Sequence, residues 1–154
     1  MNREYHIIGM MSGTSLDGLD IVKCIFDGND LRKYEIEKCE TIPYSEYWTK
    51  TLRHLHTQTE EKIQDVNIKY AKLLAKHVLS FIKRNNIKCD YIASHGHTII
   101  HQPDRGYTLQ IGDGQTIANI TGVTTINNFR SLDVSLGGEG APLVPIGDML
   151  LFPE

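Results

Sequence analysis

Small, hydroxylated and acidic residues gather near the start of the chain in a pattern suited to binding phosphate. Small residues let a phosphate group approach the backbone, hydroxyls and amides donate hydrogen bonds to its oxygens, and a carboxylate holds magnesium or a water. A turn rich in Gly and Asp that joins two strands and binds nothing is the alternative interpretation. The residues of this candidate phosphate-binding turn are Gly13, Thr14, Ser15, Leu16, Asp17, Gly18, Leu19 and Asp20.

This turn differs from the two best-known glycine-rich phosphate motifs. The Gly-x4-Gly-Lys-Ser/Thr pattern of P-loop proteins and the Gly-x-Gly-x-x-Gly pattern of dinucleotide-binding proteins are both absent from the sequence. Apolar runs precede and follow the turn, so we expect it to join two strands. A phosphate site between two strands is the arrangement that actin-like and hexokinase-like ATPases use, and the expected geometry fits that class.

A second polar segment, Ser94-His95-Gly96-His97-Thr98, is followed closely by His101. In one continuous strand His95, His97 and His101 would project to the same face, and a His-x-His pair has a spacing suited to zinc. The other interpretation is that Gly96 lets a ligand or a backbone segment come close while the imidazoles hydrogen-bond to it. Either interpretation makes this segment a candidate binding site.

A third segment combines Arg130 and Asp133 with the glycine-rich stretch Gly137-Gly138-Glu139-Gly140. A strand end that leads into a glycine-rich loop and a helix start places charge and backbone donors at the carboxyl edge of a sheet, where α/β proteins bind ligands. Asp133 is suited to act there as a base and Arg130 as the partner of an anion. The alternative is an Arg–Asp pair on the surface beside a flexible loop.

Short apolar runs predict the strands that position these segments. Each run is bounded by Gly, Pro, Asn or Asp, which commonly end strands. The expected strands are residues 5–11, 18–27, 34–42, 90–94, 98–100, 107–111 and 123–126. The first three form a meander, and the β-branched run 123–126 is typical of a buried strand.

Four helical patterns lie between or after these strands. Ser45 is expected to cap a short helix, Thr57-Gln58-Thr59-Glu60 has capping-box spacing for a long one, and Asp113 is expected to cap a third that stops at Gly122. Pro142 opens a fourth, apolar on one face. The stripe of the long helix comprises Ile63, Val66, Tyr70, Leu73, Leu74, Val78, Phe81 and Ile82. A meander followed by alternating helices and strands implies an α/β fold with a mixed sheet.

Composition excludes several classes of protein. The chain has 154 residues, of which 40% are hydrophobic and 23% charged, as in a globular domain with its own core. A net charge of −3 gives no long-range attraction to nucleic acid. The apolar run before Ser12 is too short for a signal peptide or a membrane span, which predicts a cytoplasmic protein. Cys24, Cys39 and Cys89 are too scattered for a disulfide framework or a thiolate zinc site.

Five motifs, taken together and in this order, resemble the anhydro-N-acetylmuramic acid kinases. They are Met-Ser-Gly-Thr-Ser-Leu-Asp-Gly at 11–18, Ser-His-Gly at 94–96, Leu-Gln-Ile-Gly-Asp at 109–113, Phe-Arg-x-x-Asp at 129–133 and Gly-Gly-Glu-Gly-Ala-Pro-Leu-Val-Pro at 137–145. The resemblance implies that residues 1–154 are the amino-terminal phosphate- and sugar-binding lobe of a two-lobed, actin-like and ribonuclease-H-like sugar kinase. It covers about the first two-fifths of a family member, so the second lobe is absent from this chain.

The resemblance also implies a reaction and its site residues. ATP, with Mg²⁺, phosphorylates O6 of 1,6-anhydro-N-acetylmuramic acid while water opens the anhydro ring, in the recycling of peptidoglycan. The turn from Gly13 to Asp20 would bind the ATP phosphates, Asp133 would activate the water, and Asp17 or Asp20 would hold the magnesium through a water. The residues implied to orient the sugar are Ser94, His95, Gly96, His97 and Arg130.

Two residues depart from the family pattern, which commonly has Gln where His97 stands and Asp where Asn128 stands. His97 keeps a hydrogen-bond donor and acceptor, whereas Asn128 removes a carboxylate. Two other functions stay open beside the kinase. One is a binding module that holds a sugar or phosphate without turning it over, and the other is a metal hydrolase built on the three histidines. Pairing with a second copy of the chain, to cover the apolar final helix, also stays open.

Overall fold

The computed structural model describes residues 3–141 and 143–152, which form one mixed sheet with helices on its two faces. The strands are β1 (Glu4–Ser12), β2 (Gly18–Asp27), β3 (Tyr34–Pro43), β4 (Tyr91–Gln102), β5 (Tyr107–Ile111) and β6 (Thr124–Asn127). The α-helices are α1 (Glu46–His54), α2 (Glu60–Asn85), α3 (Gly114–Thr121), α4 (Ser131–Ser135) and α5 (Leu143–Leu151). Two short 3-10 helices, η1 (Leu55–Thr57) and η2 (Pro103–Arg105), follow α1 and β4.

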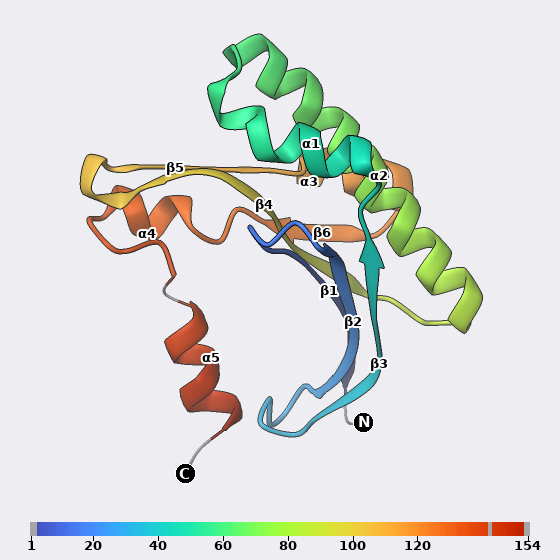
Figure 1. Ribbon diagram of the computed structural model, residues 1–154. Helices are drawn as coiled ribbons and strands as arrows, with labels where there is room; N and C mark the ends of the chain where they lie inside the picture. Colours follow the sequence, from blue (N-terminus) through green and yellow to red (C-terminus); the bar gives the residue numbers. More distant parts are fainter. Residues whose placement is uncertain (1–2, 142, 153–154) are drawn as a thin grey trace.

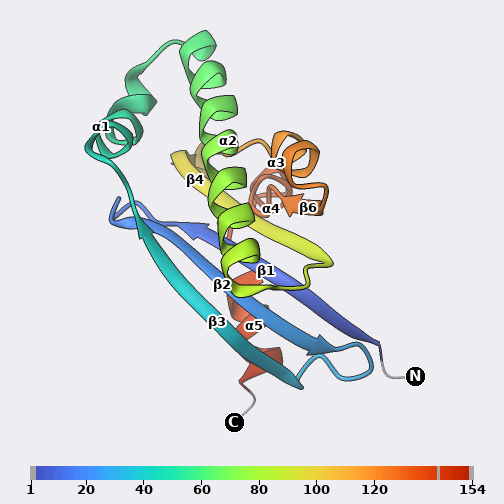
Figure 2. The same cartoon turned by 90° about the vertical axis from the view of Figure 1, so that its right-hand side faces the viewer.

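The strands lie in the order β3-β2-β1-β4-β5, and β6 also pairs with β4. The β1–β2, β2–β3 and β4–β5 pairs are antiparallel, whereas β4 runs parallel to both β1 and β6. Helix α2 lies along one face of the β1–β2–β3 meander, and α5 lies on the opposite side (Figures 1 and 2). The expected meander and α/β mixed sheet are therefore confirmed.

The core lies between α2 and the sheet. The stripe predicted for the long helix supplies Val66, Tyr70, Leu74, Val78 and Phe81, which are all buried. They pack in one cluster with buried side chains from the sheet and from the end of α1. The sheet and α1–η1 residues of that cluster are Ile8, Met10, Leu19, Ile21, Ile92, Ile111, Leu52 and Leu55. Because this cluster immobilises α2 and the ends of α1, β1 and β4, the polar residues that follow those ends are held in place.

The long helix is capped two residues later than the sequence indicates. Thr59, not Thr57, is the capping residue, and its hydroxyl accepts a hydrogen bond from the Lys62 amide. Thr57 lies inside η1, and its hydroxyl instead donates to the His54 carbonyl. At the other end Asn86 adopts the left-handed conformation that commonly closes helices. Ser45 caps α1 and Asp113 caps α3 as predicted.

Two further predictions need correction, and a third falls on a residue that the structure does not describe. The strands expected at 90–94 and 98–100 are a single strand, β4, which continues to Gln102 and leads into β5. Strand β6 is mostly exposed, with Ile126 at 49%, because it pairs with β4 alone at the margin of the sheet. Pro142 lies outside the described residues, and α5 is assigned from Leu143. No helix in the described part of the chain is long and apolar enough to cross a membrane.

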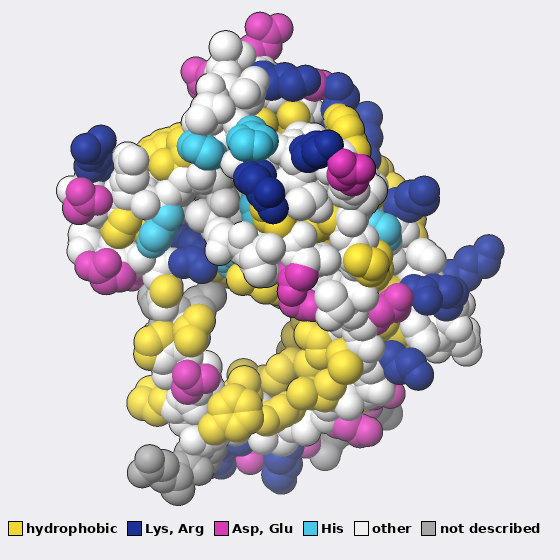
Figure 3. Space-filling model, in the orientation of Figure 1, with side chains coloured by type: hydrophobic (Ala, Val, Ile, Leu, Met, Phe, Trp, Pro, Cys, Tyr) yellow, Lys and Arg dark blue, Asp and Glu magenta, His cyan; other side chains and the backbone are white. Residues whose placement is uncertain are grey.

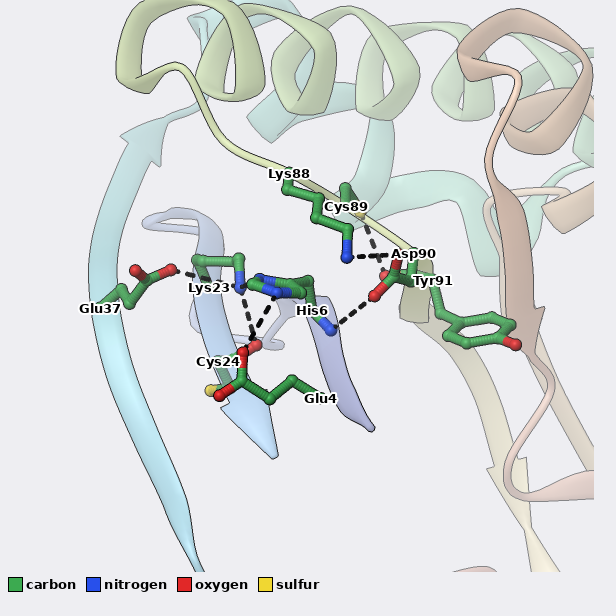
Figure 4. Close-up of polar contacts among 9 residues, drawn as sticks. All are labelled: Glu4, His6, Lys23, Cys24, Glu37, Lys88, Cys89, Asp90 and Tyr91. Atoms are coloured by element: carbon green, nitrogen blue, oxygen red, sulfur yellow. Dashed lines mark hydrogen bonds and ion pairs between the residues drawn. The ribbon is translucent and has the colours of Figure 1, made fainter. Parts of the chain in front are cut away.

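A polar cluster around the buried Lys23 joins β1, β2, β3 and the residue before β4, at the end of the sheet away from the candidate motifs (Figure 4). The Lys23 side chain is only 1% exposed, and its ammonium lies 3.2 Å from the Glu37 carboxylate. It also donates to the Cys24 carbonyl at 3.0 Å and to His6 Nδ1 at 3.1 Å. The His6 amide donates to Asp90 at 2.9 Å, a bond that lowers the pKa of this carboxyl. A charge buried in this way needs such partners, so the contacts of Lys23 favour this pairing of β1, β2 and β3.

Candidate functional site

The three parallel strands bring the candidate motifs to one edge of the sheet. Ser94 of β4 pairs with Met10 of β1 on one side and with Asn127 of β6 on the other. The carboxyl ends of β1 and β6 therefore lie on the two sides of β4 near Ser94, while β4 itself continues to Gln102 (Figure 1). In α/β proteins the crevice outside such strand ends is where ligands bind.

The turn from Gly13 to Asp17 joins β1 to β2 and is held by its own hydrogen bonds. The Leu16 amide donates to the Gly13 carbonyl at 3.3 Å, and Leu16 adopts a left-handed φ of 60°. Asp17 Oδ1 accepts from the Ser15 hydroxyl at 2.7 Å and from the Gly18 amide at 3.0 Å. The Ser15 hydroxyl is the main cause that lowers the pKa of Asp17, so its carboxylate is ionised at neutral pH.

The last three residues of the predicted turn belong to β2. Gly18 opens that strand, and a Cβ there would clash with the Ile42 carbonyl of β3. The Leu19 side chain is buried in the core, which leaves only its backbone for a ligand. Asp20 is exposed and accepts from the Thr41 hydroxyl at 2.6 Å. Asp17 and Asp20 are thus the two carboxylates nearest the turn.

A chain of buried hydroxyls connects this turn to β4 and α2. The Tyr70 and Tyr44 hydroxyls lie 2.6 Å apart, and Tyr44 donates to Ser12 Oγ at 2.7 Å. Ser12 Oγ lies 2.9 Å from His97 Nδ1. Burial raises the pKa of both phenols, so Tyr44 and Tyr70 keep their protons. Because each hydroxyl has one proton to give, the chain runs from Tyr70 through Tyr44 and Ser12 to His97 Nδ1 as the final acceptor.

His97 is therefore a neutral imidazole with its proton on Nε2. The residue is 3% exposed, and this burial lowers its pKa from 6.5 to about 4. The Ser12 hydroxyl fills its Nδ1 lone pair, so Nε2–H is the donor that remains for another partner. His97 lines a hollow next to the phosphate-binding turn.

The lowered pKa of His97 makes stability depend on pH in a defined window. Between pH 6.5 and about 4 the unfolded chain takes up a proton at this residue that the folded protein does not. The stabilisation is complete above pH 6.5 and is lost as the pH falls toward 4. We expect the free energy of unfolding of the wild type to fall between pH 7 and pH 4.5 by about 2 kcal/mol more than that of His97→Gln.

Urea unfolding followed by circular dichroism at pH 7, 5.5 and 4.5 measures this difference. Gln keeps an acceptor for Ser12 but does not titrate. His54→Gln, which removes an exposed histidine from α1, is the matched control and should keep the pH dependence of the wild type. Parallel curves for the wild type and His97→Gln would rule out the buried neutral imidazole.

His95 lies on another path of contacts, which leads to Arg130. Arg130 Nε donates to His95 Nε2 at 2.8 Å, and the guanidinium also donates to the Gly140 carbonyl at 2.9 Å. The proton of His95 is thereby placed on Nδ1, which lies 3.1 Å from the Gly96 carbonyl. Burial is the main cause that lowers the pKa of His95. Arg130 thus ties β4 to the glycine-rich loop.

Asp133 lies in α4, and the glycine-rich loop wraps around its carboxylate. Its Oδ2 accepts from the Gly140 amide at 2.6 Å, and its backbone carbonyl accepts from the Gly138 amide at 2.8 Å. A Cβ on Gly138 would clash with the carboxylate, so the loop needs glycine there. Within the described residues Oδ1 has no hydrogen-bond partner. Arg130 therefore bonds to His95 and Gly140 rather than forming the surface pair with Asp133 considered above.

The three histidines do not converge, because β4 is irregular at Gly96. Gly96 has a φ of +72°, and the pairing of β1 with β4 shifts register between Met10 and Ser12. His97 consequently bonds to Ser12 and His95 to Arg130, while His101 lies 3.1 Å from the Thr108 hydroxyl. Among the residues that the structure describes, no group of three or more His, Cys, Asp or Glu is arranged to hold a metal. The single-face arrangement considered for zinc is wrong.

A hollow of about 210 Å³ lies between the ends of β4, β5 and β6. Ser94 Oγ and Gln110 Oε1 both line it, and both are buried without a hydrogen-bond partner among the described residues. Buried polar atoms are nearly always paired, so a ligand or a water is expected here. Other polar side chains of this hollow are Asn67, His95, Thr108, Asp113, Asn127, Asn128 and Ser131. Sequence reasoning missed Asn67, because it lies in α2, far from any motif.

A second hollow, of about 230 Å³, lies between the phosphate-binding turn and the end of α1. Thr14, Ser15 and Leu16 line one side, and Arg53 and His56 line the other. His97, Thr98 and Ile99 of β4 and Leu52 of α1 complete it. Arg53 and His56 were missed because only the apolar face of α1 gave a signal. Two hollows therefore flank β4, one reached by His95 and one by His97.

Comparison with known proteins now identifies the family. The family model described as anhydro-N-acetylmuramic acid kinase matches residues 5–154. The chain belongs to the anhydro-N-acetylmuramic acid kinase family. This match spans the turn, the β4 segment, and α4 with the glycine-rich loop that follows it, so the resemblance predicted from the five motifs is confirmed.

Individual members of the kinase family agree with this assignment over nearly the whole chain. An anhydro-N-acetylmuramic acid kinase of Caldanaerobacter subterraneus subsp. tengcongensis is 41% identical over 97% of this chain and 41% of its own length. That of Francisella tularensis subsp. novicida is 37% identical over 100% of this chain and 44% of its own length. That of Bacillus cereus strain G9842 is 36% identical over 96% of this chain and 42% of its own length. The chain thus spans about two-fifths of the length of the curated relatives it matches.

Proposed function

We propose that this chain is the phosphate- and sugar-binding lobe of an ATP-dependent kinase. The enzyme opens 1,6-anhydro-N-acetylmuramic acid with water and phosphorylates O6, which gives N-acetylmuramic acid 6-phosphate. The observation that carries the proposal is the meeting of three motifs at one sheet edge, in a chain of this family. Those motifs are the turn 13–20, the segment 94–97, and Asp133 of α4 with the glycine-rich loop around it. We further propose that the reaction belongs to peptidoglycan recycling and that the protein acts in the cytoplasm.

The topology supports an actin-like, ribonuclease-H-like lobe. An antiparallel meander is followed by a helix, α2, that crosses to a strand parallel to β1, and α3 leads in the same way to β6. The phosphate-binding turn then joins the first two strands, as that class requires. Residues 1–154 form the amino-terminal lobe, and a second lobe of the size that the relatives have would supply most of the adenosine site.

Exposed apolar side chains fit a lobe that is covered in the whole enzyme. Helix α5 exposes Val144, Ile146, Met149 and Leu150. Figure 3 shows hydrophobic side chains on both sides of the gap between α5 and the sheet. A contiguous apolar surface of this kind marks an interface. The second lobe is the occupant we propose, and a second copy of the chain, forming a homodimer, is the other.

Asp133 is suited to activating water. The Gly140 amide holds Oδ2, so Oδ1 remains to take the proton of a water that attacks C1 of the sugar. The bond between C1 and the bridging oxygen then breaks, and that oxygen is released as O6. O6 attacks the γ-phosphorus, the bond to ADP breaks, and the phosphoryl group is transferred. Each bond that forms thus replaces one that breaks, and the proton ends on Asp133.

The sugar is proposed to bind beside β4, where Ser94 Oγ lacks a partner. Ser94 and His95 line the first hollow, and Arg130 connects His95 to Gly140, whose amide holds Asp133. Gly96 lets the backbone come close. His97 reaches the sugar or the phosphates from the other side of β4 through its Nε2–H. The hydrogen bonds of Arg130 to His95 and Gly140 would hold the sugar-binding residues of β4 in a fixed position relative to Asp133.

The residues of the turn fit a magnesium ion that is bound mainly by ATP. Mg²⁺ is usually held by one or two carboxylates, waters and substrate phosphates, so a cage of three protein ligands is not required. Asp17 is ionised and Asp20 is exposed, and either would hold the ion through a water. When bound, magnesium balances the charge that develops on the transferred phosphoryl group.

The test is turnover by the full-length protein with ATP and 1,6-anhydro-N-acetylmuramic acid in water labelled with ¹⁸O. We expect ADP and N-acetylmuramic acid 6-phosphate in equal amounts, with one ¹⁸O at C1, as measured by mass spectrometry. Saturable sugar binding without ADP would instead indicate a binding module. Phosphorylated sugar without the label at C1 would contradict the role of water in ring opening.

A further inference from the structure

The hollow between the phosphate-binding turn and α1 has a lining suited to an oxyanion. Its polar side chains are Thr14, Ser15, Arg53, His56 and His97, with Thr98 at its margin. Every one of them can donate a hydrogen bond, and no carboxylate lines the hollow. Figure 3 shows His side chains beside Lys and Arg side chains on this face, next to α1. The lining is therefore one of donors and positive charge.

Arg53 and His56 are held over the hollow by buried neighbours. Leu52 and Leu55 are only 3% and 1% exposed, so they anchor the end of α1 and the start of η1 in the core. Arg53 and His56 directly follow these two anchors in the chain. The Arg53 guanidinium has no ion pair or hydrogen bond within the described residues, although a carboxylate partner is common for exposed arginines on helices. Its five donors are available to a ligand.

His97 adds a donor whose direction is set by the buried hydroxyl chain. Ser12 occupies Nδ1 at 2.9 Å, so the Nε2–H of a residue that is 3% exposed remains for the hollow. An acceptor there must carry lone pairs on several oxygens to meet Arg53, His56 and His97 together.

We propose that Arg53, His56 and His97 form a subsite for the carboxylate of the acidic sugar. This inference rests on the proposed function, in which two oxyanions bind: the carboxylate of the sugar acid and the γ-phosphate of ATP. The planar fork of Arg53 matches a carboxylate with two parallel hydrogen bonds. A hollow of about 230 Å³ takes a small branch of a sugar, and its Arg53 and His56 come from α1 and η1, outside the turn residues Thr14 and Ser15 that we assign to the triphosphate.

The subsite also places the sugar relative to the chemistry. With the carboxylate at the hollow beside His97, the ring of the sugar lies over β4 and faces His95 and Arg130 on the other side. The two hollows that flank β4 then hold two parts of one substrate. A neutral sugar that lacks the carboxylate would lose the contacts of Arg53 but none of those near Ser94.

The test compares binding of 1,6-anhydro-N-acetylmuramic acid and of its neutral methyl ester to the full-length protein by calorimetry, without ATP. We expect the wild type to bind the acid about 10- to 100-fold more tightly than the ester. Arg53→Gln should abolish this preference by weakening the acid alone. Arg105→Gln, which removes the same charge from the exposed η2, is the matched control and should keep the preference.

Three outcomes would overturn the subsite. The first is a wild type that binds acid and ester equally or binds neither, and the second is an equal loss of both ligands in Arg53→Gln. The third is an Arg53→Gln variant that keeps the acid preference but raises the KM for ATP, because the oxyanion would then be a phosphate. Since binding is measured without turnover, absence of ADP formation would count against the proposed reaction and leave the subsite to be judged by these titrations.

Discussion

Replacing Asp133 by Asn should lower kcat of the full-length protein by about 10²- to 10⁴-fold, the range usual for loss of a general base. The amide oxygen of Asn still accepts from the Gly140 amide, so the glycine-rich loop keeps its shape. What is lost is the group that takes the proton of water. KM for the sugar and for ATP should change by less than about threefold, because neither substrate loses a binding contact.

The measurement is the initial rate of ADP release at saturating sugar and ATP, with the melting temperature recorded beside it. Asp104→Asn is the matched control, since Asp104 is an exposed carboxylate in η2 that no candidate motif includes. It should retain the wild-type rate. An Asp133→Asn variant that turns over as fast as Asp104→Asn would assign the base to another residue.

Gly138 lies close to the same carboxylate, which explains why the loop has a glycine at this position. The loop passes so close to Asp133 that a side chain at Gly138 cannot be accommodated without moving one of the two. The Gly-Gly-Glu-Gly motif is therefore explained by packing around Asp133, rather than by flexibility. The sequence showed that glycines and an aspartate occur together, but the reason for their spacing is visible only in the folded loop.

Much of the fold followed from local patterns. β2 begins and ends at the predicted residues, Gly18 and Asp27, because an apolar run lies there between two turn signals. The buried stripe of α2 was equally readable, since its spacing follows the helical period and nothing interrupts it. Strand β6 was expected to be buried because it is β-branched, but residue preference does not reveal whether a strand has neighbours on both sides.

The sequence predicted most residues of the candidate site but not which of them contact one another. Ser94, His95, Gly96 and His97 stand together in the sequence, yet one turn of the backbone at Gly96 divides them between two hollows. Tyr44 and Tyr70 orient Ser12 and His97 but belong to no motif. Tyr70 was predicted only as part of the buried stripe of the long helix, and no role was predicted for Tyr44. Contacts between residues far apart in the chain depend on the packing of the whole sheet, which periodicity does not encode.

The two departures from the family pattern are compatible with the hydrogen bonds of the candidate site. His97, where the family commonly has Gln, still accepts from Ser12 and keeps one donor. Asn128, where the family commonly has Asp, has a left-handed φ of 60°, which Asn tolerates, and its amide oxygen accepts from the Ser131 hydroxyl. A negative charge at position 128 is therefore not needed to hold the start of α4.

Replacing Gly96 by Ala should destabilise the protein more than any other single methyl group added to the sheet edge. Its φ of +72° is unfavourable for a residue with a side chain, and the new Cβ would clash with the Ile111 carbonyl of β5. The first effect costs about 1–2 kcal/mol and overpacking about 1–3 kcal/mol, so we expect the free energy of unfolding to fall by about 2–5 kcal/mol.

Gly106→Ala separates these two causes, because Gly106 has nearly the same φ, +66°, but open space where its Cβ would lie. Urea unfolding of both variants should show a loss of about 1 kcal/mol for Gly106→Ala and at least twice that for Gly96→Ala. Equal losses would mean that β5 yields to the methyl group and that close approach is not what Gly96 provides. A larger loss at Gly96, accompanied by a weaker affinity for the sugar, would show that the same backbone turn that separates His95 from His97 also shapes the site.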